Sequence, residues 1–319
     1  MDQGHADDLI RGVREGDVPC VARVLSMVEN GHDLAPVMMH DLYDPERAGL
    51  TVGITGPPGA GKSTLTSRLI SHWRLAGRKV GVIAVDPSSP FSGGALLGDR
   101  LRMQEHASDP GVFIRSMGSR GHLGGLAGST RDALEVLAAA SYDPVLVETV
   151  GVGQAEVEIA SLADLTLLVL VPGLGDEVQT MKAGIMEIGD MIVLNKADRQ
   201  GIDQLESAVM ASLELISDES RRPPVIRCSA QTGQGVEDLT AEIDRFISGM
   251  EGRAEMARRR TSLILESIIR EKGREMAGAV VAERFGSVDE AVESILRGET
   301  TPYRIGSMLS HYPRRAIGE

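Results

Sequence analysis

The sequence predicts an α/β protein built on a doubly wound, mostly parallel sheet with helices on both faces. Short runs rich in Val, Ile and Leu alternate with segments of helical period through the middle of the 319-residue chain. The apolar runs are continuous, which is typical of strands buried on both faces. A glycine-rich turn follows the first run and opens a helix, as an anion-binding loop does. These observations predict one α/β domain of about two hundred residues.

Seven strands are expected in this domain, each short and aliphatic. They lie at Leu50–Ile54, Lys79–Val85, Val112–Arg115, Pro144–Glu148, Thr166–Val171, Asp190–Leu194 and Pro224–Arg227. Helical periodicity predicts connecting helices at 64–76, 95–107, 128–140, 155–162, 176–187, 203–217 and 235–247. Because strands and helices alternate, we expect repeated strand–helix–strand units and a parallel sheet.

Helices are also expected on the N-terminal side of this domain. Residues 6–30 carry an apolar stripe that Gly16 and Pro19 interrupt, which predicts one helix or a pair. Residues 33–48 predict one more short helix. We therefore expect residues 1–48 to form a small helical extension.

The pattern changes after Gly249. Residues 251–284 carry no strand signal, and their apolar side chains recur with a helical period. Ser287 and Glu290 fit a capping box for the next helix, and Thr301-Pro302 favours the start of a last one.

This helical tail has apolar residues but little sequence in which to bury them alone. We expect these apolar side chains to be buried against the core or against a second subunit. The expected regions are therefore an extension at 1–48, a nucleotide-binding domain at 49–248 and a helical dimerisation region at 249–319.

Charge and composition limit the classes of function. The formal net charge of −13 argues against a general nucleic-acid binder. Two distant cysteines, Cys20 and Cys228, provide no disulfide framework and fit a reducing cytosol. The acidic N-terminus has no signal-peptide core, and the apolar run Leu165–Val171 is too short to span a membrane. We therefore expect a cytoplasmic protein without nucleic-acid or membrane partners.

The residues after the first strand form a complete P-loop motif. They spell GPPGAGKS and match G-x-x-x-x-G-K-[ST] between a strand and a helix. The glycines let successive backbone N–H groups point at a phosphate, and the helix adds its positive end. Lys62 is expected to reach the β- and γ-phosphates and the Ser63 hydroxyl to ligate Mg²⁺. The candidate phosphate-binding residues are Gly56, Pro57, Pro58, Gly59, Ala60, Gly61, Lys62, Ser63 and Thr64.

A second motif, Glu148-Thr149-Val150-Gly151, ends a later apolar strand. A carboxylate at that place, before a glycine turn, is typical of a Walker-B group with a γ-phosphate-sensing amide. We expect Glu148 to hold the Mg²⁺ shell and the Gly151 N–H to contact the γ-phosphate.

A third motif, Asn195-Lys196-Ala197-Asp198, again follows a strand and predicts guanine selection. The Asp198 carboxylate can accept the ring N–H and the exocyclic amine of guanine, a donor pair that adenine lacks. Lys196 is expected to cover the face of the base, and Asn195 to brace neighbouring loops by hydrogen bonds.

A fourth segment, Cys228-Ser229-Ala230-Gln231, follows the last strand. A backbone N–H among Ser229, Ala230 and Gln231 can donate to the guanine carbonyl oxygen. The P-loop combined with N-K-x-D predicts GTP and GDP as ligands in place of ATP.

The middle of the chain closely resembles the GTPases associated with methylmalonyl-CoA mutase, the MeaB/ArgK group with the MMAA-type proteins. The resemblance is carried by VDPSSPFSGGALLGDR at 85–100, FIRSMGSRGHLGGLA at 113–127, ETVGVGQAE at 148–156 and PGLGDEVQTMKAGIMEIGDMIVLNKAD at 172–198. It is dense over residues 45–235 and extends in outline to both flanks. The group belongs to the SIMIBI class of P-loop GTPases.

The resemblance implies further site residues. Asp86 and Asp99 match acidic positions around Mg²⁺ and the γ-phosphate, so the implied metal ligands are Ser63, Asp86, Asp99 and Glu148. Residues 113–127 match switch I and 148–156 match switch II. Residues 173–187 match a further switch segment that responds to the partner protein, with Gln179 and Lys182 at its functional positions.

The resemblance also implies a partner and an oligomeric state. Members of this family hydrolyse GTP to gate adenosylcobalamin loading into an acyl-CoA mutase, and they protect or reactivate that mutase. They form homodimers through helical tails. Which acyl-CoA mutase this chain serves stays open, and it lacks the D-x-H-x-x-G loop for binding cobalamin itself.

The residue after Gly151 is Val152, where small GTPases place a water-orienting glutamine. We therefore expect slow basal hydrolysis, with Lys182 adding positive charge and Gln179 positioning groups when the partner docks. Gln154 is an alternative water-orienting residue, although a hydrogen-bonding role in switch II is favoured for it.

The residues disfavour two other functions. A metallochaperone GTPase that delivers nickel needs a cluster of Cys and His with ligand spacing, and the sequence shows none. An ATP-dependent kinase linked to amino-acid transport is disfavoured by N-K-x-D.

Overall fold

The computed structural model describes residues 3–47, 49–86, 104–118, 125–149, 162–173, 188–219, 222–249 and 252–311. The chain divides into two compact units, Met1–Leu263 and Ile264–Glu319. The first unit holds the sheet and the motifs named above.

The first unit is organised by a seven-stranded sheet in the order β3-β2-β4-β1-β5-β6-β7. All neighbouring strands pair in parallel. The strands are β1 (Thr51–Thr55), β2 (Val80–Asp86), β3 (Val112–Gly118), β4 (Val145–Thr149), β5 (Leu165–Leu170), β6 (Met191–Leu194) and β7 (Val225–Arg227). Each expected strand is present, so the doubly wound α/β class is confirmed.

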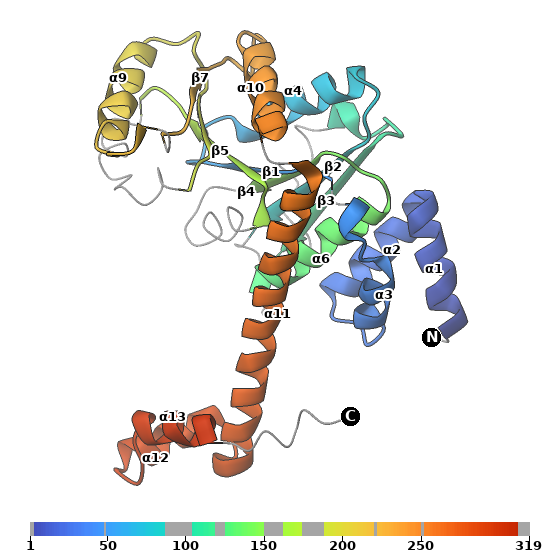
Figure 1. Cartoon of the computed structure of the whole chain (residues 1–319), viewed down its shortest axis with the longest axis vertical. Helices are drawn as coiled ribbons and strands as arrows, with labels where there is room; N and C mark the ends of the chain where they lie inside the picture. The colour runs from blue at the N-terminus through green and yellow to red at the C-terminus, as the bar shows by residue number, and fades with distance from the viewer. Residues whose placement is uncertain are drawn as a thin grey trace. The chain divides into compact units, whose positions relative to one another are not determined.

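Helices cover both faces of this sheet (Figure 1). On one face, α4 (Lys62–Leu75) and α10 (Val236–Gly249) pack through an aliphatic core centred on β1 and β5. On the other, α6 (Gly125–Ala139) packs against β2 and β4, and α9 (Ile202–Leu213) packs against β5 and β6. Because every strand is parallel, the loops after β1, β4, β6 and β7 meet at one edge.

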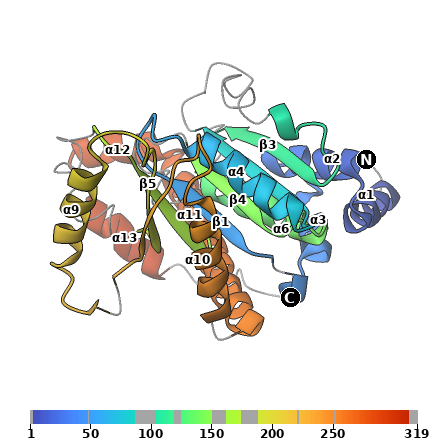
Figure 2. The same ribbon diagram turned by 90° about the horizontal axis from the view of Figure 1, so that it is seen from above.

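The N-terminal helices share a core with the sheet domain. They are α1 (Gln3–Glu15), α2 (Val18–Glu29) and α3 (Ala35–Leu42), followed by the 3₁₀ turn η1 (Pro45–Arg47). Their buried side chains form one cluster with α6, β2 and β3. Arg115 of β3 pairs with Glu29 of α2 at 2.6 Å. Figure 2 shows α2 beside β3.

Two helix boundaries differ from the expected ones. The helix expected over 33–48 ends at Leu42, and Tyr43 is extended. Pro45 disfavours helical backbone at Asp44, so the helix does not continue through this segment. The helix expected over 203–217 ends at Leu213. The helices expected at 95–107, 155–162 and 176–187 fall largely outside the described residues.

The C-terminal segment is helical, as expected. It comprises α11 (Gly252–Phe285), α12 (Val288–Leu296) and α13 (Pro302–His311). The Ser287 hydroxyl accepts a hydrogen bond from the Glu290 N–H at 3.0 Å, which caps α12. No helix among the described residues is both long enough and apolar enough to cross a bilayer.

The first turns of α11 belong to the sheet domain. Arg260 donates to Glu135 of α6 at 2.9 Å and to the Gly49 carbonyl at 3.2 Å. Tyr43 and Thr261 share a hydrogen bond of 2.7 Å between their hydroxyls. These contacts attach the start of α11 to α6 and to the segment before β1.

Candidate nucleotide-binding site

The loop between β1 and α4 has a backbone that only glycine accommodates. Gly56 adopts φ +139°, and a Cβ there would lie 2.2 Å from the Val169 carbonyl oxygen. Gly61 adopts φ +85°, and its Cβ would lie 2.6 Å from Asn195 Nδ2. A side chain at either position would clash with fixed groups and require a strained φ. The loop therefore curls close to β5 and β6, as a phosphate cradle requires.

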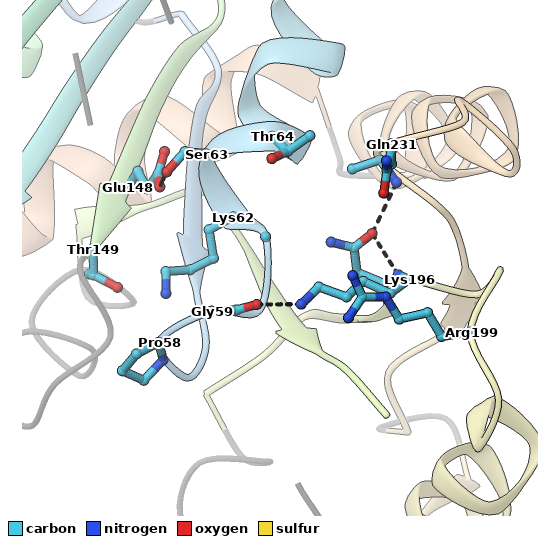
Figure 3. A pocket seen from close by; sticks show the side chains of 13 residues that line it. Pro58, Gly59, Lys62, Ser63, Thr64, Glu148, Thr149, Lys196, Arg199 and Gln231 are labelled. Carbon is cyan, nitrogen blue, oxygen red and sulfur yellow. Dashed lines mark hydrogen bonds between the residues drawn. The ribbon is translucent and has the colours of Figure 1, made fainter. Parts of the chain in front are cut away.

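A cavity of about 410 Å³ opens in front of this loop (Figure 3). It is lined by Pro58, Gly59, Gly61, Lys62, Ser63, Thr64, Glu148, Thr149, Asn195, Lys196, Arg199, Ala230 and Gln231. These residues come from the loops after β1, β4, β6 and β7 and from the first turn of α4. The cavity therefore lies where open parallel sheets bind ligands, at the carboxyl ends of their strands.

Lys62 is folded over the loop that contains it. Its Nζ donates to the carbonyl oxygens of Gly56 at 2.7 Å and Pro57 at 3.1 Å, and the side chain is buried. It is the first residue of α4, so its ammonium group reinforces the positive end of that helix. This arrangement concentrates positive charge where a phosphate anion is expected to lie.

An oxygen-rich group lies at the end of β4. The Ser63 hydroxyl donates to Glu148 Oε1 at 2.5 Å, and the Thr66 hydroxyl donates to Oε2 at 2.9 Å. All three side chains are buried. Hydroxyl and carboxylate oxygens are the ligands that Mg²⁺ prefers, so the donor chemistry of Ser63 and Glu148 fits this ion. In the described part of the chain, no three His, Cys, Asp or Glu residues cluster as a metal site.

Asn195 joins three loops that border the cavity. Its Nδ2 donates to the Ala60 carbonyl at 2.8 Å, and its Oδ1 accepts from the Lys196 N–H at 2.8 Å and the Ala230 N–H at 3.0 Å. Burial raises the pKa of the Cys228 thiol to about 12, so the thiol stays protonated beside Oδ1, 3.7 Å away. Asn195 therefore hydrogen-bonds to the loops after β1 and β7 as well as to its own loop.

The two charged residues after Asn195 have different surroundings. Lys196 has φ +60°, and its Nζ donates to the Gly59 carbonyl at 2.7 Å (Figure 3). Burial lowers the pKa of Lys196, and the Arg199 charge lowers it further. Asp198 is exposed and does not line the cavity. A hydrogen bond from Ser229 holds the pKa of Asp198 below its ordinary value, so the carboxylate is ionised at neutral pH.

Several expected site residues are not described by the structure. Asp99, Gly151, Gln179 and Lys182 lie outside the described residues. Asp86 is the last residue of β2, but its side chain is not described. Thr64 and Gln231 line the cavity with exposed side chains, and Ser229 is fully buried beneath it.

Three residues of this region had no role in the sequence analysis. Thr66 holds Glu148, Arg68 bonds to the loop after β7, and Arg199 lines the cavity. Thr66 lies one helical turn after Lys62, so the spacing of polar residues on α4 is the signal that was available. Arg199 directly follows the N-K-x-D motif, whereas nothing in the sequence indicates the partner of Arg68.

The parallel sheet, the glycine-constrained loop and the Lys62 cradle define a P-loop nucleotide-binding protein. Comparison with known proteins narrows that class. The sequence pattern of the family described as methylmalonyl Co-A mutase-associated GTPase MeaB matches residues 21–281. The chain belongs to this family of P-loop GTPases.

Relatives from different organisms agree with this assignment. A protein of Pyrococcus abyssi is 46% identical over 308 residues, which cover 95% of each chain. The mouse protein named methylmalonic aciduria type A homolog, mitochondrial, is 35% identical over 278 residues, 81% of this chain and 67% of that one. GTPase ArgK of Escherichia coli is 36% identical over 265 residues, 80% of each.

A solved structure shows the same fold over nearly the whole chain. The crystal structure described as that of a LAO/AO transport system kinase has a TM-score of 0.70 and 25% sequence identity. The similarity covers 98% of both chains.

Proposed function

We propose that this protein binds GTP with Mg²⁺, hydrolyses it to GDP and phosphate, and thereby acts as a chaperone for an adenosylcobalamin-dependent acyl-CoA mutase. Its cycle gates cofactor loading and protects or reactivates the mutase. The observation that carries the proposal is Asn195, which joins the phosphate loop at Ala60 to the loop at Ala230 in a chain of the MeaB family. A nucleotide spanning the cavity would meet both loops at once.

The phosphates are held by the loop between β1 and α4. The non-proline residues between Gly56 and Thr64 supply backbone N–H groups, and Lys62 would exchange its carbonyl partners, Gly56 and Pro57, for phosphate oxygens. Bonds from an ammonium to an anion are stronger than bonds to neutral carbonyls, so this exchange favours the bound state. The γ-phosphate contact is assigned to the Gly151 N–H.

The base is held by the loops after β6 and β7. Asp198 accepts the guanine N–H groups, the Lys196 stem covers the base, and the loop Ser229–Gln231 donates to the guanine carbonyl. The lowered pKa of Asp198 supports its part, because an ionised carboxylate accepts from two donors at neutral pH.

Mg²⁺ is assigned to Ser63 and Glu148, with Asp86 and Asp99 as further ligands. The ion supplies charge compensation for the phosphate oxygens when bound. Ser63 and Glu148 already lie in contact, so few side-chain rearrangements are needed to bring their oxygens together.

Hydrolysis is expected to be slow without a partner, because Val152 follows Gly151 where small GTPases carry a glutamine. Gln179 is assigned to positioning and Lys182 to added positive charge once the mutase docks. Cobalamin is assigned to the mutase and not to this chain.

The C-terminal helices are assigned to a homodimer. Leu265, Ile269 and Met276 of α11 are more than half exposed in the single chain, at 56%, 62% and 53%. Their spacing places them on one stripe of the helix. An apolar stripe on a charged helix is expected to be covered by a second subunit.

The test is GTP turnover with and without purified acyl-CoA mutases, namely those acting on methylmalonyl-, isobutyryl-, 2-hydroxyisobutyryl- and ethylmalonyl-CoA. We expect slow basal turnover that one mutase stimulates. The Lys62→Ala variant is the control for contaminating activity and should be inactive in both conditions. The absence of stimulation and of a nucleotide-dependent complex with all four would refute the partner, and equal turnover of ATP and GTP would favour the kinase alternative.

A further inference from the structure

Arg68 connects the phosphate-loop helix to the loop after β7. Its Nε donates to the Ala230 carbonyl oxygen at 2.8 Å, and its Nη2 donates to the Gln231 carbonyl oxygen at 2.9 Å. Arg68 lies on α4, which begins at Lys62, and its side chain is exposed outside the cavity. One guanidinium therefore holds two successive peptide units in the fork geometry that arginine provides.

Ala230 is held from two directions. Its N–H donates to Asn195 Oδ1 at 3.0 Å, and its carbonyl accepts from Arg68 at 2.8 Å. Ala230 and Gln231 both line the cavity. Figure 3 shows Gln231 on the side away from Glu148. Asn195 fixes the inner side of this loop, and Arg68 fixes its outer side.

The Arg68 bonds also have an electronic consequence. The Ala230 carbonyl and the Gln231 N–H belong to the same peptide unit. A cation bonded to the carbonyl oxygen polarises that unit and makes its N–H a stronger donor. The N–H thus strengthened belongs to the segment that the proposed function assigns to the guanine carbonyl.

We propose that Arg68 is a positioning residue for guanine recognition. It keeps the Ala230–Gln231 peptide oriented and polarised toward the carbonyl edge of the base, and it ties that edge to the helix of the phosphate cradle. The inference rests on the proposed binding of guanine nucleotides at this cavity. It concerns the base alone, because Arg68 contacts no group of the phosphate loop in the described structure.

The experiment compares dissociation constants for GDP, ADP and inorganic pyrophosphate in wild type, Arg68→Ala and Arg68→Lys. Arg68→Ala removes two charge-assisted hydrogen bonds at an exposed position and should raise the dissociation constant for GDP about 3- to 10-fold. The dissociation constants for ADP and pyrophosphate should change less than about twofold, so the ratio of ADP to GDP dissociation constants should fall. Arg68→Lys keeps the charge without the fork and should give an intermediate loss.

The matched control is Arg245→Ala. Arg245 is an exposed arginine of α10 paired with Glu242, and it does not line the cavity. This variant should bind all three ligands like the wild type.

The outcomes separate the inference from the proposed function. A wild-type protein without preference for GDP over ADP would refute the proposed function and the inference with it. A selective wild type with unchanged selectivity in Arg68→Ala would refute the inference alone. Equal weakening of GDP, ADP and pyrophosphate would also refute it, because Arg68 would then act through the fold of α4. Thermal unfolding of each variant detects that case independently.

Discussion

The Ser63 hydroxyl donates a hydrogen bond of 2.5 Å to Glu148 Oε1, which joins the first turn of α4 to the last residues of β4. The two residues are far apart in the sequence, and the parallel pairing of β1 with β4 brings them together. The proposed Mg²⁺ site depends on this contact.

Replacing Glu148 by Gln is expected to weaken Mg²⁺ binding more than nucleotide binding. The amide keeps the size of the side chain but removes the negative charge that attracts the ion. We expect the Mg²⁺ concentration needed for half-maximal GTP hydrolysis to rise at least about tenfold, whereas GDP affinity measured in EDTA should change little. A parallel loss of GDP affinity in EDTA would contradict the assignment of Glu148 to the metal.

Thr66 is expected to position Glu148. Thr66→Val removes the hydrogen bond to Oε2 at nearly constant volume and leaves a buried carboxylate oxygen with one donor fewer. The free energy of unfolding should fall by about 1–3 kcal/mol, and the half-saturating Mg²⁺ concentration should rise. Thr66→Ser retains the hydroxyl and should restore the Mg²⁺ dependence, which a purely structural role would not require. Urea unfolding and Mg²⁺ titration of fluorescent GDP binding measure the two effects.

The Gly56→Ala substitution is expected to damage the phosphate loop itself. The new Cβ would lie 2.2 Å from the Val169 carbonyl oxygen, a backbone group that cannot rotate away. We expect a loss of about 2–4 kcal/mol in the free energy of unfolding and loss of GDP binding. The control is Gly77→Ala, which has φ +77° but nothing within 4 Å of its Cβ. That variant should lose only about 1–2 kcal/mol from backbone strain and keep GDP affinity.

The buried ion pair Arg260–Glu135 should make the free energy of unfolding depend on pH. Burial raises the pKa of Glu135 above its ordinary value of 4.5, although the Arg260 charge opposes the rise. A carboxyl group whose pKa is raised in the folded state stabilises the fold at a pH below its ordinary, unfolded-state pKa. This stabilisation is lost as the pH rises through the pKa of the folded state. Arg260→Ala removes the opposing charge, so the pKa of Glu135 should rise further.

The destabilisation by Arg260→Ala should therefore depend on pH. We expect about 3–5 kcal/mol at pH 8, where an ionised Glu135 would be a buried charge without this partner. The loss should be smaller at pH 5, because a lower pH favours the protonated form of a carboxyl group whose pKa is raised. Urea unfolding of wild type and Arg260→Ala at both pH values measures the difference. In the double variant with Glu135→Gln the pH dependence should shrink to the part that comes from Asp164, whose pKa the Arg260 charge also lowers. An undiminished pH dependence would contradict its assignment to Glu135.

The exposed stripe on α11 is expected to control the oligomeric state. Ile269→Lys places a charge on a side chain that is 62% exposed in the single chain, so the fold of that chain should tolerate it. A dimer that buries this stripe should dissociate, with a dissociation constant at least about 100-fold higher. Analytical ultracentrifugation reports the mass. Leu75→Lys, at an equally apolar but 90% exposed position of α4, should leave the dimer intact.

The strands and the main motifs of this fold were predictable because their signals are local. The continuous apolar runs predicted all seven strands, and Ser287 predicted the cap of α12, since these features depend on near neighbours in the chain. The C-terminal ends of α3 and α9, at Leu42 and Leu213, were less predictable. For α3, the helical periodicity competes with Pro45, which disfavours helical backbone before it.

The packing of the N-terminal helices could not be predicted from local sequence patterns. Their apolar stripe predicted helices but not their partner, and the structure packs them on α6 and β3, with Glu29 paired to Arg115. The same holds in the site, where the sequence indicated Lys62, Glu148 and Asn195 but not the contacts of Thr66 and Arg68.

The sequence alone determined that this chain carries a phosphate loop and an N-K-x-D motif on a parallel sheet, because glycine spacing, strand pattern and motif order are properties of short segments. The tertiary structure determined which side chains meet: Ser63 and Thr66 with Glu148, Asn195 with Ala60 and Ala230, and Arg68 with the loop after β7. These pairs lie far apart in the sequence, and their contacts depend on the strand order β4-β1-β5-β6-β7 that brings the loop ends to one edge of the sheet. No local pattern encodes that order.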